Sequence, residues 1–294
     1  MSAAEGQQQQ QSSSSSQIFA GGALSGVSVL VTGGGTGLGR ETALEMARCG
    51  ARVTIAGRRA DVLEQAAASI SSAAGPIDWI AGDIREPDDA ARLVETVLEQ
   101  LGRLDVLVNN AGGQFFSPAE LIAAKGWRAV WRLNVEGMLN MSETVFRLAF
   151  EPAGSGTVIN VTLSPHHGMP GMVHSGAARA TVEALTLELA QRWQPAGVTV
   201  CAVAAGHFDT EILAKYPASV RAGSSRSVPL QRLGRPDEHA WLVTLLASPL
   251  GKAFNGSTVT LDGARDNWFG PWPPAGMADE SGDVPVEERR AAPG

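Results

Sequence analysis

Short apolar runs alternate with helical patterns along most of this chain, and this alternation is the strongest constraint on its fold. Candidate strands lie at residues 27–32, 52–56, 77–81, 105–109, 156–162, 197–203 and 257–261. Candidate helices lie between them, at residues 38–49, 60–73, 86–101, 126–149, 173–193 and 237–247. Strands that alternate with helices of this length form right-handed β–α–β units, whose parallel sheet is covered on both faces. We therefore expect a single α/β domain with a doubly wound parallel sheet of about seven strands.

The two ends of the chain differ in composition from this central part. Residues 1–20 are rich in Gln and Ser and lack the basic start and apolar middle of a signal peptide, so we predict a disordered tail there. Residues 21–264 form the predicted domain, and residues 265–294 form a Trp- and Pro-rich extension that ends in a polar, disordered tail. The aromatic residues of 268–274 are too apolar to remain in solvent, so we expect that segment to pack on the domain or on a neighbouring subunit.

Composition argues against several classes of function. The formal net charge of −7 does not suit a nucleic-acid surface, which needs clustered Lys and Arg. No apolar run approaches the ~18 residues of a membrane span. Cys49 and Cys201 lie far apart in apolar surroundings, which favours two buried thiols over a disulfide and predicts a cytoplasmic protein. We predict no metal site.

The first candidate strand runs into a glycine-rich turn and then a helix, which together predict a phosphate cradle. Gly33 and Gly37 permit the tight turn, and Gly39 lets the helix lie close to the strand. The N-terminus of the helix presents backbone N–H groups to a pyrophosphate. The pattern predicts a Rossmann-type dinucleotide site at the carboxyl ends of the strands, with cofactor contacts from Thr32, Gly33, Thr36, Gly37, Leu38 and Gly39.

The residues after the second candidate strand indicate which dinucleotide is bound. In NAD-preferring sheets of this kind an acidic residue at that point accepts a hydrogen bond from the ribose 2′-OH. Here Arg58 follows the strand and no acid is present, so a planar, permanently charged group is placed to bind a 2′-phosphate. The alternative is a solvated arginine at a helix start. We predict NADP(H) as the cofactor.

Further motifs follow the glycine turn at ordered distances. Asp83 and Ile84 follow the third strand, Asn109-Asn110-Ala111-Gly112 the fourth, Asn134 lies within a helix, and Ser175 and Arg179 lie near the start of another. From about residue 24 to 264 the chain resembles the short-chain dehydrogenase/reductase family. The resemblance implies that Asp83 binds the adenine amino group, that Asn110 lies beside the adenosine ribose, and that Thr210 contacts the nicotinamide carboxamide. The predicted cofactor set also includes Ile84, Gly112, Arg179 and Gly206, although Ala205 stands before Gly206 where the family usually has proline.

The chain departs from that family at the usual catalytic pair, Tyr-x-x-x-Lys. Here the pair is Ser175 and Arg179, which share a helix face because they are four residues apart. In the family the tyrosine hydroxyl exchanges a proton with the substrate oxygen, and the lysine lowers the pKa of that tyrosine. The pKa of a serine hydroxyl lies far above the phenol value of ~10, and arginine stays protonated. Ketone-to-alcohol chemistry by the usual route is therefore disfavoured.

Two longer segments, residues 109–120 and 174–180, resemble peroxisomal trans-2-enoyl-CoA reductases. The 2,4-dienoyl-CoA reductases are next nearest, and they carry Ser at the position of Ser175 and Asn at that of Asn134. The resemblance implies NADPH-dependent reduction of the C=C bond of an enoyl-CoA thioester, in fatty acid metabolism. Such a site needs hydrogen-bond donors for the negative charge on the carbonyl oxygen. We predict Asn134, Ser164, Ser175 and Arg179 as the catalytic residues, with Ser164 at a position where the dienoyl reductases have tyrosine.

Several alternatives remain open at this point. The proton donor is Tyr216, His166, His167 or water. Five basic residues and no acid occur in residues 212–235, which suits the phosphates of CoA or a solvated loop. Two other functions fit the motifs: a citronellol-type alcohol or aldehyde dehydrogenase, and a catalytically inactive cofactor-binding scaffold. By resemblance, the helices at 126–149 and 173–193 pair across subunits, so we expect a homodimer or homotetramer. The expected partner is a small-molecule substrate, an acyl-CoA.

Overall fold

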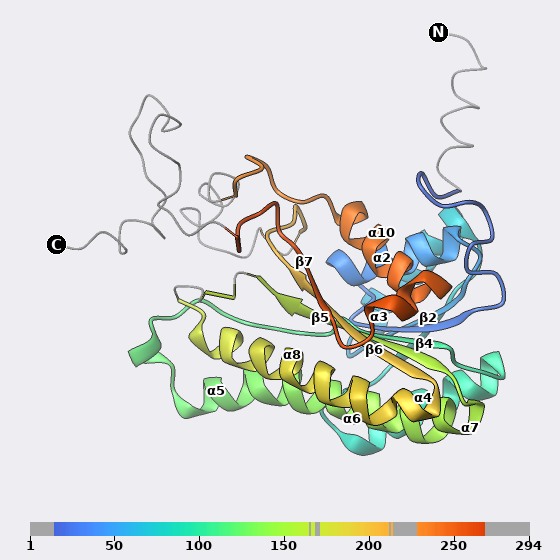
Figure 1. The fold of residues 1–294 in the computed structure, drawn as a ribbon, viewed down its shortest axis with the longest axis horizontal. Coiled ribbons are helices and arrows are strands. Elements are labelled where there is room, and N and C mark those ends of the chain that lie inside the picture. The colour runs from blue at the N-terminus through green and yellow to red at the C-terminus, as the bar shows by residue number, and fades with distance from the viewer. Residues whose placement is uncertain (1–14, 165, 168–170, 212, 214–227, 268–294) are drawn as a thin grey trace, which may run out of the picture.

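A computed structural model describes residues 15–164, 166–167, 171–211, 213 and 228–267 of the chain. They form three layers, with a seven-stranded sheet between two layers of helices (Figure 1). Residues 15–20 lie against the domain, where the Ser16 hydroxyl donates to the buried Glu45. The segment 268–274, which we expected to pack on protein, lies outside the described residues, as does Tyr216.

The sheet confirms the predicted fold class, because all neighbouring strands are parallel. Its strand order is β3-β2-β1-β4-β5-β6-β7. The order reverses between β1 and β4, and in open parallel sheets ligands bind at the carboxyl ends of the strands beside such a reversal. The strands are β1 (Ser28–Thr32), β2 (Arg52–Gly57), β3 (Asp78–Ala81), β4 (Val106–Asn109), β5 (Gly156–Leu163), β6 (Val198–Ala205) and β7 (Thr258–Leu261).

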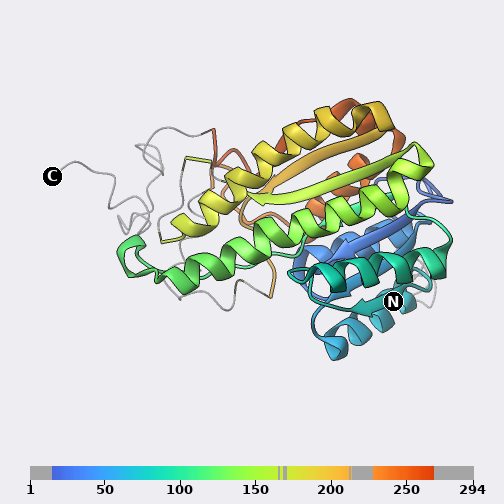
Figure 2. The same ribbon diagram turned by 90° about the horizontal axis from the view of Figure 1, so that it is seen from below.

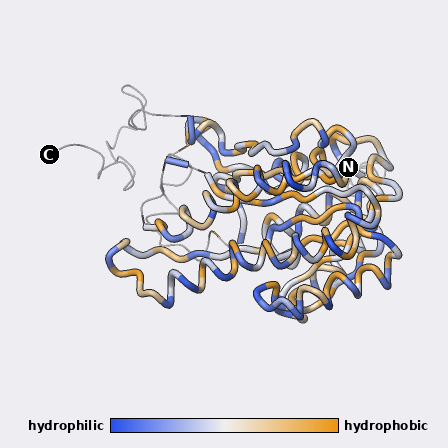
Figure 3. Tube along the Cα trace, turned by 60° about the horizontal axis from the view of Figure 1, so that its bottom comes forward, coloured by the Kyte–Doolittle hydropathy of each residue, from blue (hydrophilic) through white to orange (hydrophobic). Residues whose placement is uncertain are grey.

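The helices cover both faces of the sheet (Figure 2). One apolar cluster packs α2 (Gly37–Arg48), α3 (Ala60–Ala74) and α10 (Pro236–Ala247) against one face, and a second packs α4 (Pro87–Leu101), α6 (Gly137–Val145) and α8 (Val173–Trp193) against the other. Along the helices, hydrophobic and hydrophilic residues alternate with the turns (Figure 3), as expected for elements that each bury one face. Short 3-10 helices span Ala119–Leu121, Gln194–Ala196 and Pro249–Phe254.

The helix expected at residues 126–149 is present as one run of helical backbone, but it contains two π-helical turns. It divides into α5 (Ala124–Trp131), a π-helical turn (Arg132–Glu136), α6, a second π-helical turn (Phe146–Phe150) and α7 (Glu151–Ala153). Asn134 lies in the first π turn and its side-chain amide donates to the backbone oxygen of Val130, 2.9 Å away. A π turn inserts one extra residue, which changes the direction of the following side chains. No hydrophobic period marks such an insertion, so the sequence predicted an uninterrupted helix.

Both cysteines are buried free thiols, as expected. Burial raises the pKa of Cys49 to about 11 and the pKa of Cys201 to about 12, so both remain protonated and unreactive near neutral pH. Among the helices described, none is long and apolar enough to cross a membrane.

A chain of buried side-chain hydrogen bonds connects the sheet with the α6–α8 layer. Asn109 donates to Ser142 at 2.8 Å and to Asn160 at 2.9 Å. Asn160 in turn donates to the Thr186 hydroxyl at 2.9 Å, and that hydroxyl donates to the backbone oxygen of Val182 at 2.8 Å. These groups are 5% exposed or less, so each depends on its protein partner. The chain fixes how α8 lies along β5.

We predict that Thr186→Val lowers the free energy of unfolding by about 1–3 kcal/mol, because the buried Asn160 amide loses its acceptor without a change in side-chain volume. The matched control is Thr181→Val on the same helix, where the lost hydroxyl bond to Ala177 is exposed. It should change stability by less than about 0.5 kcal/mol. Urea denaturation followed by circular dichroism measures both, and equal effects of the two substitutions would contradict this role of Thr186.

Candidate active site

The turn between β1 and α2 has the geometry of a phosphate cradle. Gly33 has a φ of +67°, and a Cβ there would lie 2.9 Å from the Cα of Ala111. Thr32 joins the turn to the end of β4, because its hydroxyl accepts from the backbone N–H groups of Asn110 and Ala111 at 3.1 Å each. Asn110 also donates from its side chain to the Thr32 backbone oxygen at 3.0 Å. The predicted residues Gly33, Thr32 and Asn110 therefore come together.

The first turn of α2 faces an anionic group. Thr36, at the N-cap, makes no side-chain capping bond, which leaves the first backbone N–H groups of α2 available to other acceptors. The Gly37 N–H donates to a carboxylate oxygen of Glu211 at 3.0 Å, and Arg40 lies 3.6 Å from the same oxygen. The adjacent Thr210 is thereby placed beside the cradle. This turn suits a pyrophosphate, since it already binds a carboxylate. No motif in the sequence indicated Glu211.

The predicted adenosine end contains two arginines and one acid. Arg58 is exposed directly after β2. Asp83 follows β3, and its carboxylate accepts from the Arg85 side chain, with Nε at 2.9 and 3.0 Å from the two oxygens. That bond is the main reason why the pKa of Asp83 is lowered, and the positive charge of Arg58 contributes. Ile84 is buried beside Gly137. The sequence analysis did not identify Arg85, because an Asp–x–Arg sequence does not show that the arginine side chain folds back onto the aspartate.

Three predicted residues meet at the end of β4. Asn134 holds the loop after β4 from both sides: its amide donates to the Gly113 backbone oxygen at 2.9 Å and its oxygen accepts from the Gly113 N–H at 3.1 Å. Arg179 crosses from α8 and donates to the backbone oxygen of Val161 in β5 at 2.8 Å. A Cβ on Gly112 would overlap the Arg179 guanidinium and would lie 2.8 Å from the Asn134 side-chain oxygen. Only glycine at 112 lets both side chains close on this loop.

Ser175 lies one turn before Arg179 and is completely buried. Its hydroxyl donates to the side-chain oxygen of Gln114 at 2.8 Å, a partner that the sequence did not indicate. His174 is buried beside it, with its ring centroid 4.4 Å from that of Phe115 and 6.0 Å from that of Trp127. Burial lowers the pKa of His174, so this imidazole stays neutral at physiological pH. Neither the Ser175 hydroxyl nor the neutral His174 imidazole has the acidity of the tyrosine phenol that the family carries at this site.

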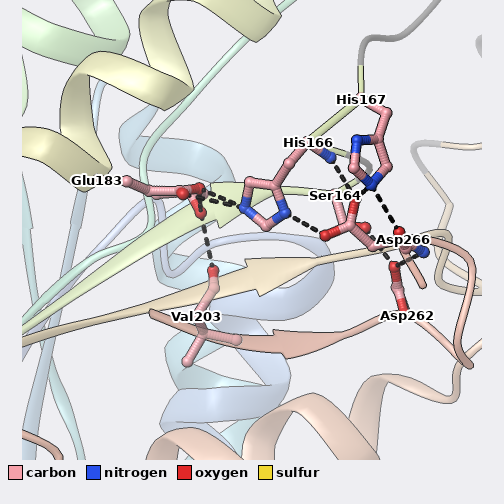
Figure 4. A network of polar contacts seen from close by, with 8 residues as sticks. Ser164, His166, His167, Glu183, Val203, Asp262 and Asp266 are labelled. Carbon is pink, nitrogen blue, oxygen red and sulfur yellow. Dashed lines mark hydrogen bonds and ion pairs between the residues drawn. The ribbon is translucent and has the colours of Figure 1, made fainter. Parts of the chain in front are cut away.

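Ser164 lies directly after β5. It is buried, and its hydroxyl donates to the carboxylate of Asp262, which follows β7 (Figure 4). A Cβ on Gly206 would lie 2.5 Å from the Cβ of Asp262, so the predicted residues Ser164 and Gly206 converge on this acid. Donation from Ser164 to a substrate oxygen would replace its bond to Asp262.

The candidate proton donors lie in different settings. His166 has both ring nitrogens bonded to carboxylates, those of Glu183 and Asp266. His167 places Nε2 2.9 Å from the backbone oxygen of Asp266. Tyr216 lies outside the described residues, as do three of the five basic residues of 212–235. The other two, Arg232 and Arg235, form ion pairs with Glu238 and Asp237 at the start of α10, acids that lie just beyond the segment counted in the sequence.

No group of three His, Cys, Asp or Glu side chains in the described part of the chain could hold a metal ion. The arrangement is instead a glycine cradle followed by Asn134, Ser175 and Arg179 around one loop, at the carboxyl ends of β1, β4 and β5. Comparison with known proteins agrees with this geometry. The family model described as short chain dehydrogenase matches residues 28–220. The chain belongs to the short-chain dehydrogenase/reductase family. Its members use NAD(P)(H).

Two curated relatives are described as 2,4-dienoyl-CoA reductases. A probable enzyme of this kind from Bacillus subtilis is 33% identical over 84% of this chain and 98% of the relative. The peroxisomal enzyme of Danio rerio is 34% identical over 84% of this chain and 83% of the relative. Among solved structures, a citronellol catabolism dehydrogenase from Pseudomonas aeruginosa PAO1 is 39% identical with a TM-score of 0.77, covering 86% of this chain and 99% of that one. The chain is therefore an oxidoreductase of this family.

We predict that Gly112→Ala weakens dinucleotide binding about tenfold or more, a loss of about 1.4 kcal/mol, because the new methyl group displaces the Arg179 guanidinium. The control is Gly176→Ala on α8, where a Cβ meets no atom within 4 Å. Fluorescence titration with reduced dinucleotide gives both dissociation constants. Equal values for the two variants would show that the close approach at Gly112 does not matter for binding.

Proposed function

We propose that this protein is an NADPH-dependent oxidoreductase that reduces the C=C bond of α,β-unsaturated acyl-CoA thioesters. The observation that supports this most directly is that Ser175 stands at the position where the family has its catalytic tyrosine. Ser175 is buried there with its proton directed at Gln114, and Arg179 replaces the lysine one turn later. This pair offers no group that transfers a proton to a ketone oxygen near neutral pH.

Reduction of a conjugated C=C bond needs less from the protein than reduction of a ketone. A bound reduced nicotinamide would supply hydride to carbon, and negative charge would collect on the thioester oxygen. The fixed charge of Arg179, held by Val161 and enclosed by Gly112, would bind the nicotinamide ribose and stabilise that negative charge. Ser164 would donate to the thioester oxygen in exchange for Asp262, and Asn134 would keep the loop of Gly112 in place. Water would later protonate the enolate.

The relatives support an acyl-CoA as the class of substrate, since both curated relatives reported above are described as 2,4-dienoyl-CoA reductases. A second candidate, an alcohol or aldehyde dehydrogenase, is favoured by the 39% identity to the citronellol catabolism dehydrogenase. Among the candidate donors, His166 has both ring nitrogens engaged by carboxylates. Tyr216, His167 and water remain for either reaction.

The experiment that tests the function compares NADPH oxidation with crotonyl-CoA, a 2,4-dienoyl-CoA and citronellal under the same conditions. Turnover with an acyl-CoA but not with citronellal supports the proposal. Turnover with citronellal alone favours the second candidate. Cofactor binding without turnover on any of the three would favour a non-catalytic role.

For cofactor choice, we predict that Arg58→Asp weakens NADPH binding by about 1–3 kcal/mol, the scale of a lost charge-assisted contact, and affects NADH binding much less. The reason is that Arg58 follows β2 where NAD-preferring sheets have an acid. Arg59→Asp is the matched control, because it makes the same charge change one residue away. Dissociation constants of both cofactors decide the matter; an unchanged NADPH constant in Arg58→Asp rejects the assignment.

For the chemistry, we predict that Asn134→Ala, Ser164→Ala and Arg179→Ala each lower kcat on enoyl-CoA by up to ~10²–10³, the effect of removing one oxyanion donor or its support. Restoring the family pair with Ser175→Tyr and Arg179→Lys should not raise this activity, because the reaction needs no phenol. Tyr216→Phe should leave turnover intact. If Tyr216→Phe alone abolishes turnover while NADPH still binds, the site has a tyrosine donor and the proposed chemistry is wrong.

A further inference from the structure

A circuit of hydrogen bonds and ion pairs, closed by the backbone between Thr162 and Ser164, links the end of β5 to α8 and to the segment after β7 (Figure 4). Thr162 donates to Glu183 of α8 at 2.7 Å, and Glu183 lies 2.9 Å from Nε2 of His166. The other ring nitrogen of His166 is bonded to Asp266. The Asp266 N–H donates to Asp262 at 2.7 Å, and Asp262 accepts the Ser164 hydroxyl. None of these bonds involves the glycine cradle, Asn134 or Arg179.

The circuit joins three parts of the fold that are distant in sequence: the end of β5, the middle of α8 and the segment after β7. His166 is the only member of it that bonds both α8 and the C-terminal segment. Its backbone N–H adds a third bond, to Asp266 at 2.6 Å. Since carboxylates occupy both ring nitrogens, no ring N–H is left to face a substrate, and the ring is suited to holding rather than to proton transfer.

We propose that His166 is a positioning residue that fixes the backbone at Ser164 beside Asp262 by bridging Glu183 and Asp266. The inference rests on the proposed function in giving Ser164 a role at the substrate oxygen. The cationic imidazole holds the two carboxylates together, and His166 is thereby fixed just after β5. When the imidazole loses its proton, one of the two carboxylates loses its hydrogen bond and Ser164 is no longer held in one place.

The charges around His166 agree with a protonated ring. Burial alone lowers the pKa of His166, but the bond to Asp266 and the negative charges of Glu183 and Asp266 outweigh it, and the pKa is raised above its ordinary value of 6.5. Burial raises the pKa of the Asp266 carboxyl, but the hydrogen bonds from His166 outweigh burial and the pKa is lowered. Among the described residues, His167 also lies near the circuit, with Nε2 3.8 Å from a carboxylate oxygen of Asp266.

The sign of the pH dependence follows from these directions. A histidine with a raised pKa stabilises the folded state fully below its ordinary pKa, and that contribution disappears as pH rises through the raised value. A carboxyl with a lowered pKa contributes above its ordinary pKa, and its contribution disappears as pH falls through the lowered value. The bridge is therefore intact at pH values between the lowered pKa of Asp266 and the raised pKa of His166, and it is lost as pH rises through the raised value.

The test uses Glu183→Gln in the full chain, with Glu188→Gln as control. Glutamine keeps an oxygen that accepts from Thr162 and removes only the charge, and Glu188 is an exposed carboxylate on the same helix. NMR titration of isotope-labelled imidazoles gives the midpoint of His166. Hydrogen exchange of the Leu163, Ser164, His166 and His167 amides as a function of pH reports on how firmly these residues are held. Neither measurement needs a substrate. The third readout is the pH profile of kcat with crotonyl-CoA and NADPH.

In the native protein and in Glu188→Gln we expect a midpoint above 6.5, with exchange rising and kcat falling only above that midpoint. In Glu183→Gln all three should move to lower pH together, so that at one pH unit above the variant's own midpoint kcat is about tenfold below its plateau, with KM for NADPH unchanged. His166→Gln should show fast exchange and low kcat without an alkaline transition.

An unchanged imidazole midpoint in Glu183→Gln overturns the proposal. So does a shifted midpoint with unchanged exchange at these four amides, because the bridge then would not position Ser164. If imidazole and exchange behave as expected while no acyl-CoA is reduced, the bridge stands and the proposed function fails. If crotonyl-CoA is reduced with the same alkaline limb in Glu183→Gln as in the native protein, the function stands and His166 has no positioning role.

Discussion

The position of α8 on β5 depends on three polar contacts that lie about one helical turn apart. Thr186 accepts from Asn160, Glu183 accepts from Thr162, and Arg179 donates to the backbone of Val161. Each of these groups is largely removed from water, so a slip of the helix along the strand would leave several of them unpaired. Ser175 lies one turn further along the same helix. The register that buries these contacts thus also sets where Ser175 and Arg179 stand relative to the loop after β4.

The proposed cofactor site carries an excess of positive charge, although the formal net charge of the whole chain is −7. Arg58 and Arg85 flank Asp83 at one end, and Arg40 lies beside the first turn of α2. Glu211 bonds that turn in this structure, and a pyrophosphate that binds there would take the place of its carboxylate. Arg179 is the fixed charge at the far end. Such a row of cations along one edge of the sheet suits a polyanionic dinucleotide.

The two residues at the positions of the family's tyrosine and lysine, Ser175 and Arg179, make different contacts from that pair. A phenol and a lysine would act on the proton of the substrate oxygen, whereas Ser175 and Arg179 act on the protein itself, through Gln114 and Val161. The other polar groups at the ends of β5 and β7 are bonded to one another, as the Ser164–Asp262 and His166–Asp266 pairs show. The site is therefore an assembly of positioned donors around the loop of Gly112.

The sequence by itself determined the fold class, the strands to within about two residues at each end, the glycine cradle and the family, because these depend on local period, on glycine at tight turns and on motif spacing. It did not reveal the π turn at Asn134, because an inserted residue leaves no hydrophobic signature. Nor did it reveal Gln114, Glu183, Asp262 and Asp266, which contact the predicted residues from segments distant in sequence. Only the tertiary structure brings such side chains together, since their contacts depend on the register of α8 and on the adjacent carboxyl ends of β5 and β7.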